Sequence, residues 1–68
     1  GLDLVLNIVN NAVDYLTEDG ILVVEMGDNQ EQLENMYPGL AFTWLDTVSG
    51  DGIVFLLTYD QLYSYFNA

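Results

Sequence analysis

The chain has 68 residues, of which 11 are aspartate or glutamate and none is lysine, arginine or histidine, so its formal net charge is −11. At ordinary usage roughly eight basic residues would be expected at this length. A surface of carboxylates without cations repels phosphate, which excludes direct binding to nucleic acids and disfavours anionic membranes. The absence of cysteine and histidine excludes disulfides, thiolate metal sites and imidazole chemistry.

The length limits the chain to one small domain with a single core. With 51% hydrophobic and 13% aromatic residues, it is too apolar for a disordered acidic tail. Its longest apolar runs, residues 21–24 and 53–57, are far shorter than the ~20 residues that cross a membrane. We therefore expect a folded chain without a membrane span.

An amphipathic helix is predicted first, over residues 3–16. Apolar side chains recur at spacings of three and four, at Leu2, Val5, Val9, Ala12, Val13 and Leu16. Residues 17–20 supply a turn that ends in glycine. The unbroken apolar run that follows, residues 21–26, is typical of a strand buried on both faces.

A second, shorter helix is predicted after this strand. Asp28, with Glu31 three residues later, has the form of a capping box and predicts a helix that continues through Tyr37. The Pro38–Gly39 pair then ends the helix.

Two strands and a final helix complete the predicted order α-β-α-β-β-α. Residues 41–47 are rich in aromatic and β-branched types, and residues 49–52 predict a hairpin loop. The run 53–57 is apolar throughout, which favours a central strand. Asp60 is expected to be the N-cap of the last helix.

The connections predict the topology of the sheet. A four-residue loop joins only antiparallel neighbours, whereas the first strand, joined through a helical crossover, should run parallel to the second. A sheet ordered first, third, second meets both conditions. We therefore predict an α/β fold with a three-stranded mixed sheet and flanking helices, as one unit over residues 1–68.

Four stretches point to a family. Residues 1–5 read Gly-Leu-Asp-Leu-Val and residues 25–30 read Glu-Met-Gly-Asp-Asn-Gln. They resemble the segment after the Asn-Pro-Pro-Tyr motif, and the Glu-x-Gly-x-x-Gln at the end of the fifth strand, of the glutamine amide methyltransferases that act on ribosomal proteins and release factors. Residues 37–45 and 50–58 are similar to the subgroup that methylates a large-subunit ribosomal protein. Together these similarities cover essentially the whole chain.

The resemblance implies a Rossmann-like, S-adenosylmethionine-dependent protein-glutamine N-methyltransferase, with residues 1–68 as the C-terminal third of its catalytic domain. It places the cofactor loop, the acidic residue that holds the ribose and the Asn-Pro-Pro-Tyr motif upstream of Gly1. The chain alone is therefore expected to be inactive, with no catalytic residue, no cofactor-binding residue and no bound cofactor. The resemblance also implies a cytoplasmic protein whose partner is the remainder of the domain. Loss of that remainder would expose the edge of the first strand, which predicts a homo-oligomer.

The chain departs from the family in its charges. The family usually has a basic pair near Leu6–Asn7 and commonly a lysine or arginine at Tyr59, and both places are uncharged here. This leaves a different reading open, an engineered cation-free chain with a structural purpose and no activity. An acidic module that binds a basic partner, such as a ribosomal protein, is a third reading based on charge alone.

Glu25, Asp28 and Asn29 are the candidate site residues. They lie at the carboxyl end of a strand of parallel type, where open α/β folds place their binding crevices, so they could form the rim of an active cleft. Alternatively, Gly27 makes the turn, Asp28 caps a helix and Glu25 is a polar strand end.

No metal site is expected, because Asp46, Ser49 and Asp51 do not follow the spacing of a calcium loop. Two sets of aromatic residues allow further readings. The first set could stack against a ligand but is more typical of a core, and comprises Tyr37, Phe42, Trp44, Phe55 and Tyr59. The second set predicts a docking surface or a contact with another copy, and comprises Tyr63, Tyr65 and Phe66.

Overall fold

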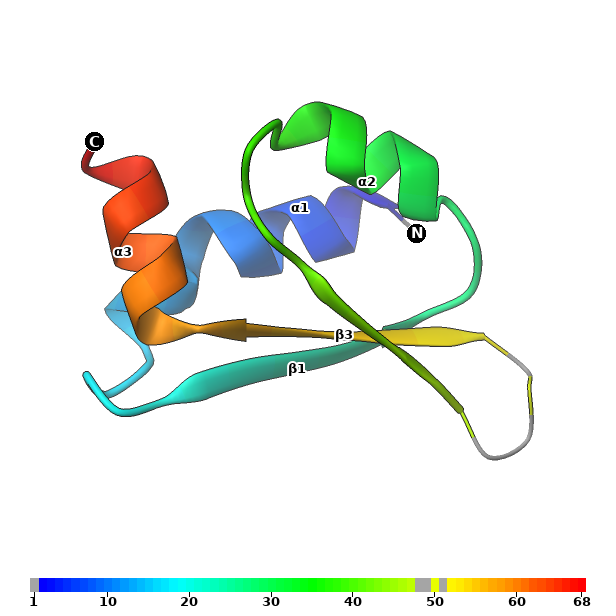
Figure 1. Ribbon diagram of the computed structural model, residues 1–68, viewed down its shortest axis with the longest axis horizontal. Helices are drawn as coiled ribbons and strands as arrows, with labels where there is room; N and C mark the ends of the chain where they lie inside the picture. Colours follow the sequence, from blue (N-terminus) through cyan, green and yellow to red (C-terminus); the bar gives the residue numbers. More distant parts are fainter. Residues whose placement is uncertain (1, 48–49, 51) are drawn as a thin grey trace.

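Helices cover one face of a three-stranded sheet in the computed structural model, which describes residues 2–47, 50 and 52–68 (Figure 1). In chain order the elements are α1 (Leu2–Asn11), a 3₁₀ turn (Ala12–Asp14), β1 (Ile21–Met26), α2 (Gln30–Met36), β2 (Thr43–Asp46), β3 (Ile53–Thr58) and α3 (Tyr59–Phe66). The predicted order α-β-α-β-β-α is confirmed. The hairpin loop predicted at 49–52 falls largely outside the described residues.

The strands are ordered β1-β3-β2, as predicted. Both ladders are antiparallel: Val23 and Thr43 each pair with Leu56 from opposite sides of β3. The first and second strands run in the same direction, but they are not neighbours. The predicted α/β fold, strand order and strand directions are thus confirmed, and because β3 lies between the two strands that run in the same direction, the sheet is antiparallel rather than mixed.

The core lies between the sheet and the helices. Its largest fully buried side chains come from every helix and from β3, and are Val9, Leu33, Phe55, Leu57 and Leu62. The ring of Phe55 meets Phe42 edge-on, with centroids 5.2 Å apart, and meets Trp44 at 5.6 Å. These aromatic contacts confirm the core reading of the strand aromatics.

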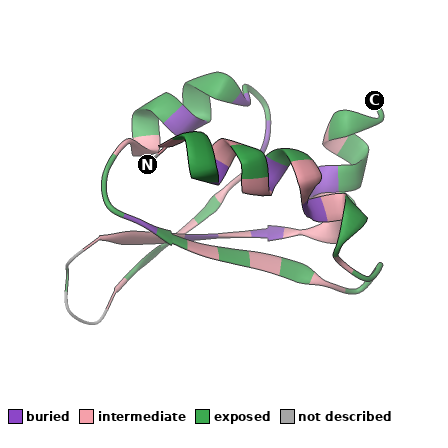
Figure 2. Cartoon of the chain, turned by 180° about the vertical axis from the view of Figure 1, so that it is seen from behind, coloured by how far each residue is buried: buried purple, intermediate pink, exposed green. Residues whose placement is uncertain are grey.

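The other face of the sheet is exposed along β1 (Figure 2). Ile21, Val23 and Glu25 are exposed, whereas Leu22 and Val24 are half-buried against the helices. The prediction that residues 21–26 are buried on both faces is therefore wrong for this chain. The reason is that all the helices among the described residues lie on the same side of the sheet.

The first helix is shorter than the predicted range 3–16. It ends at Asn11, and the chain continues as a 3₁₀ turn through Asp14 before Tyr15 leaves the helical path. The apolar spacing alone could not locate this change, because Ala12 and Val13 still pack in or against the core from the tighter turn.

Both predicted helix caps are wrong. The residue before α2 is Asn29, in the left-handed conformation with φ 71° and no side-chain cap, so Asp28 and Glu31 form no capping box. The N-cap of α3 is Thr58, two residues earlier than expected, because Thr58 and Gln61 form a reciprocal capping box. Asp60 therefore lies in the first turn of α3.

Among the described residues, no helix is long and apolar enough to span a bilayer.

Candidate functional site

A hollow of about 380 Å³ lies at the carboxyl end of β1. The first turn of α1, the end of β1 and the turn after it contribute its lining, which comprises Leu2, Leu4, Val5, Glu25, Met26, Gly27, Asp28 and Asn29. All three candidate residues thus line one hollow. The structure brings them together as the sequence predicted, while their role remains a prediction.

Backbone contacts fix the position of this end of β1. A Cβ atom on Gly52 would lie 2.8 Å from the carbonyl oxygen of Met26, and Gly52 has φ +137°, which L side chains rarely adopt. Only glycine therefore lets the start of β3 approach β1 so closely. Asn29, in the turn that follows β1, has a left-handed backbone conformation.

The lining of the hollow combines apolar residues with two acidic ones, and we call the apolar ones its floor and the acidic end of β1 its rim. Leu2, Val5 and Met26 provide the floor, with Met26 and Val5 buried in the core. Glu25 and Asp28 are exposed carboxylates, and ionised carboxylates only accept hydrogen bonds. The site can therefore bind hydrogen-bond donors or positive groups, and the chain has no cation to neutralise it.

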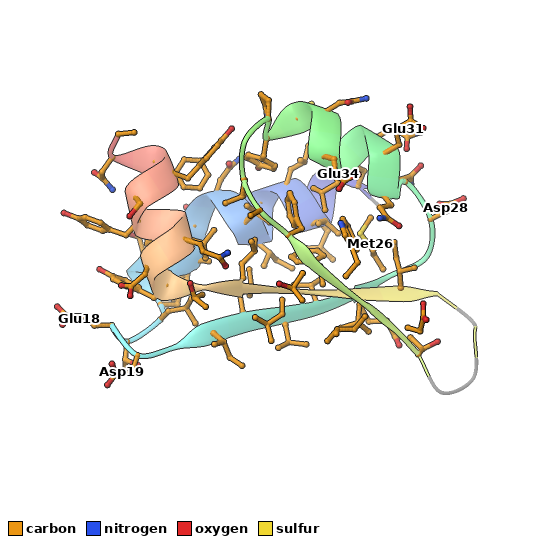
Figure 3. All side chains as sticks on the ribbon, viewed as in Figure 1. Glu18, Asp19, Met26, Asp28, Glu31 and Glu34 are labelled. Atoms are coloured by element: carbon orange, nitrogen blue, oxygen red, sulfur yellow. The ribbon has the colours of Figure 1, made fainter. Side chains whose placement is uncertain are left out.

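Acidic side chains project from the turns on either side of β1 and from α2 (Figure 3). Glu18 and Asp19 project from the turn before β1, and Asp28 projects from the turn after it. The alternative in which Asp28 caps α2 is wrong, as described above, so helix capping does not explain why an aspartate stands at this position.

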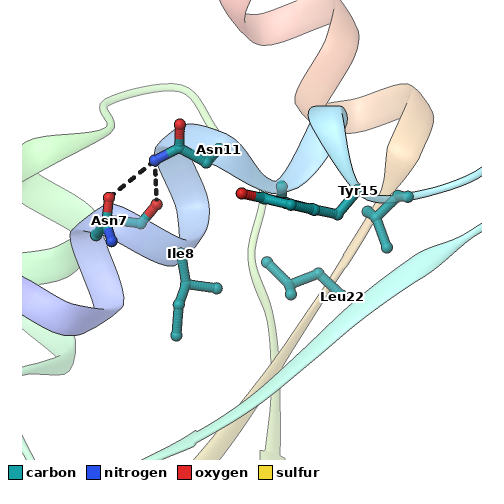
Figure 4. Close-up of a pocket in the computed structure, with 7 residues that line it drawn as sticks. Asn7, Ile8, Asn11, Tyr15 and Leu22 are labelled. Atoms are coloured by element: carbon teal, nitrogen blue, oxygen red, sulfur yellow. Dashed lines mark hydrogen bonds between the residues drawn. The ribbon is translucent and has the colours of Figure 1, made fainter.

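Sequence reasoning missed a second hollow, of about 440 Å³, between α1 and β1 (Figure 4). Asn7, Ile8, Asn11, Tyr15 and Leu22 lie on its wall. The amide nitrogen of Asn11 donates to both the backbone and the side-chain oxygen of Asn7, at 2.8 and 2.9 Å. The sequence feature that could have indicated this hollow is the pair Ile8 and Tyr15, two large apolar or aromatic residues on the polar side of the predicted helix.

The aromatic residues do not form one stacking platform. Tyr37 and Phe55 are buried, while Tyr59 stacks on Tyr63 on the surface of α3, with centroids 5.8 Å apart. Tyr65 and Phe66 both meet the ring of Tyr37 edge-on. Part of the C-terminal aromatic set therefore packs inside the chain, and Tyr63 is the member most exposed, at 51%.

No group of three histidines, cysteines, aspartates or glutamates is placed to hold a metal ion within residues 2–47, 50 and 52–68.

An α/β sheet with helices on one face, and a polar hollow at a strand's carboxyl end, is compatible with the C-terminal portion of a methyltransferase. Comparison with curated proteins is more specific. Over 62 residues the chain is 53% identical to the ribosomal protein uL3 glutamine methyltransferase of Neisseria gonorrhoeae, covering 91% of the chain and 21% of that protein. The protein of the same name from Francisella tularensis is 47% identical over 68 residues, covering 100% and 22%. The one from Burkholderia pseudomallei is 42% identical over 62 residues, covering 91% and 20%.

The chain is thus homologous to a segment of the ribosomal protein uL3 glutamine methyltransferases, and the resemblance read from its residues is confirmed. It spans only about a fifth of the length of these relatives, which is consistent with a C-terminal fragment. No family model matches the chain, and no solved structure matches it.

Proposed function

We propose that the chain is the C-terminal part of an S-adenosylmethionine-dependent protein-glutamine N-methyltransferase that acts on a ribosomal protein. The observation that carries this proposal is the 53% identity over 62 residues to a ribosomal protein uL3 glutamine methyltransferase. In this proposal the cofactor loop and the Asn-Pro-Pro-Tyr motif belong to the remainder of the domain. The 68-residue chain alone is inactive.

The hollow at the end of β1 is the part of the chain that would face substrate. A glutamine amide has two N–H donors, and the residues that line the hollow include two with carboxylate acceptors, Glu25 and Asp28. Methylation of an amide depends mainly on holding the nitrogen in line with the methyl group, so orientation is the chemistry that these residues can supply. Asn29, at the same rim, could donate to the carbonyl oxygen of the same amide.

The cofactor fits this electrostatic environment. S-adenosylmethionine is a sulfonium cation that supplies the methyl group when bound, and an acidic rim without cations favours a positive charge nearby. The chain's own contribution is to attract and orient; no residue of the chain is assigned to hold the cofactor.

The partner in this proposal is the remainder of the methyltransferase domain. The edge of β1 opposite β3 has no strand neighbour among the described residues, and open edges pair readily with other strands. The isolated chain should therefore associate with itself through this edge. Sedimentation as a stable monomer of 7.6 kDa would contradict that expectation.

A chimaera tests the function directly. In the Neisseria gonorrhoeae relative, the segment matched by the chain is replaced with the corresponding residues of this chain, and transfer of a labelled methyl group to purified uL3 is measured. We expect methyl transfer to a glutamine of uL3. A folded chimaera that transfers no methyl group would refute the proposal.

The rim residues are tested within the same chimaera. The double variant Glu25→Gln, Asp28→Asn should lower kcat/KM about tenfold or more, because it removes two charged acceptors from the hollow. Glu31→Gln is the matched control, since Glu31 is also an exposed carboxylate but does not line the hollow. Equal effects of the two changes would argue against the rim.

A further inference from the structure

A hollow of about 370 Å³ lies at the end of the molecule opposite the candidate site, and the proposed function does not use it. Its lining comprises Glu18 from the turn before β1, and Tyr59, Asp60 and Tyr63 from α3. Figure 3 shows Glu18 near the start of β1 and Asp28 near its end. We call this second place the α3 hollow.

Backbone hydrogen bonds hold the two parts of this lining together. The N–H group of Tyr59 donates to the carbonyl oxygen of Gly20 at 2.9 Å, which joins the start of α3 to the turn before β1. The N–H group of Gly20 donates in turn to the carbonyl oxygen of Thr17 at 2.8 Å and closes the turn that carries Glu18. The backbone therefore places Glu18 next to the first turn of α3.

The two tyrosines of the lining form a stacked pair, four residues apart on α3. Their ring planes are inclined by 22°, and the ring centroids are 5.8 Å apart. Tyr59 is half-buried and Tyr63 is exposed, so part of this aromatic surface is open to water. The face of a tyrosine ring is negative and attracts a cation that comes within about 6 Å of the centroid. The aromatic part of the lining therefore favours a positive ligand.

The carboxylates of the lining favour the same kind of ligand. Glu18 and Asp60 are exposed, and ionised carboxylates only accept hydrogen bonds. Because the chain has no lysine, arginine or histidine, no side chain of its own can supply the cation. Calcium takes about six to eight oxygen ligands, more than two carboxylates and two phenols provide, so an organic cation fits the lining better than this metal.

We propose that the α3 hollow binds an arginine side chain of a basic protein partner. The guanidinium group is planar, stacks on aromatic faces and donates through a rigid fork of N–H groups that matches a carboxylate. The ammonium group of lysine is compact and strongly hydrated, so it exploits the rings and the carboxylates less fully. Nucleic acids are excluded as partners, because the same carboxylates repel phosphate.

The strength of these contacts indicates that the arginine belongs to a segment with several basic residues. An exposed cation–π contact or an exposed ion pair changes affinity by only about fivefold or less, so a single guanidinium group would bind weakly. The net charge of −11 attracts each further basic residue of the segment. Overall charge thus supplies much of the affinity, and the α3 hollow determines where the segment binds.

The aromatic contribution is tested by fluorescence anisotropy. A dye-labelled, end-blocked peptide of alternating glycine and arginine is titrated with the 68-residue chain at about 0.15 M sodium chloride. Tyr63→Leu removes a ring without changing the charge and should weaken binding about fivefold. Tyr63→Phe keeps the ring and should bind within about twofold of wild type. Tyr15→Leu is the matched control, because Tyr15 is 84% exposed but lies outside the hollow, and it should also stay within about twofold.

The carboxylate contribution is tested with two variants of equal net charge. Glu18→Gln and Glu31→Gln each remove one negative charge, but only Glu18 lines the hollow. Glu18→Gln should weaken binding about threefold or more, and Glu31→Gln less than about twofold. Asp60 is left unchanged, because an acidic residue in the first turn also favours the helix itself. The same peptide with lysine in place of arginine should bind about threefold more weakly.

Equal weakening by Glu18→Gln and Glu31→Gln, or by Tyr63→Leu and Tyr15→Leu, would overturn the proposal, because binding would then follow overall charge or exposed aromatic surface alone. Equal binding of the arginine and lysine peptides would overturn the choice of arginine. The chimaera described above should show the same losses. A chimaera that does not bind the peptide would mean that the remainder of the domain covers the α3 hollow, which would also overturn the proposal. None of these measurements depends on methyl transfer, so the failure of this proposal and that of the methyltransferase function are distinguishable.

Discussion

The hydroxyl of Tyr37 lies 2.7 Å from the side-chain oxygen of Asn10 and donates a hydrogen bond to it. This bond joins the residue after α2 to the last turn of α1. The ring of Tyr37 is buried, and both Tyr65 and Phe66 of α3 meet it edge-on, with centroids 6.2 and 6.0 Å away. One side chain therefore contacts all three α-helices and fixes them over the sheet.

Removing this hydroxyl should loosen the helical layer. Tyr37→Phe keeps the ring and its aromatic contacts but removes the hydrogen bond to Asn10, so the free energy of unfolding should fall by about 1 kcal/mol. Urea denaturation followed by circular dichroism measures the change. Tyr63→Phe is the control, because Tyr63 is exposed and its loss of a hydroxyl should have almost no effect. Equal stability of wild type and Tyr37→Phe would show that the bond contributes nothing.

Alkaline pH should destabilise the fold through the same residue. Burial, and secondly repulsion from Tyr65, raise the pKa of Tyr37 above its ordinary value of 10.0. Below pH 10 the group is protonated in both states, and its contribution is fully present. As the pH rises from 10 towards the higher pKa of the folded state, the unfolded chain loses a proton that the folded chain keeps, so stability falls. The decline between pH 9.5 and about 11 should be steeper in wild type than in Tyr37→Phe; identical slopes would contradict this.

The order of the elements could be predicted because its signals are local. The apolar runs 21–26 and 53–57 each lie within one strand, and the Pro38–Gly39 stop follows the end of α2, as predicted. The burial of β1 could not be predicted in the same way. A run of apolar residues indicates that a strand is built for two covered faces, but it does not say whether both coverings lie within the same chain.

The capping box at the start of α3 should stabilise the end of β3 as well as the helix. Thr58 accepts from the backbone N–H of Gln61 at 3.1 Å, and the Gln61 side chain accepts from the backbone N–H of Thr58 at 2.9 Å. Thr58→Ala should cost about 1 kcal/mol. Asp60→Ala, the residue expected from sequence to be the cap, should change stability by less than about 0.5 kcal/mol. The reverse ranking in chemical denaturation would mean that Asp60 caps the helix after all.

The cap error has a physical reason. Thr58 and Asp60 are both good N-cap residues, and the sequence places a glutamine three residues after the first of them. The choice depends on where β3 ends, and the pairing of Thr58 with Ile21 sets that end. In the candidate site, likewise, Glu25 and Asp28 could be predicted from their place at the carboxyl end of a strand. The apolar part of the lining could not be predicted in this way, because Leu2 and Val5 come to the hollow only through the packing of α1 beside β1.

Gly52 should be harder to replace than Gly39. Both have positive φ, but an added Cβ finds open space at Gly39, whereas at Gly52 it would lie 2.8 Å from the carbonyl oxygen of Met26. Gly39→Ala should cost about 1–2 kcal/mol from backbone strain alone. Gly52→Ala should cost more, because β1 and β3 must also separate at the rim of the hollow. In the chimaera only Gly52→Ala should also lower kcat/KM. Equal losses of kcat/KM in the two variants would show that the contact between Gly52 and Met26 does not support the site.

Salt should stabilise the isolated chain. Its 11 carboxylates have no basic partner, so their net interaction is repulsive, and the Debye length falls from about 10 Å at 0.1 M to about 3 Å at 1 M salt. The Tm should therefore rise with sodium chloride. Glu18→Gln, which removes one exposed charge beside Asp19, should raise the Tm at low salt and lose most of that advantage at high salt. A Tm that falls with salt, or an equal benefit of Glu18→Gln at every salt concentration, would show that charge repulsion does not limit the stability of this fold.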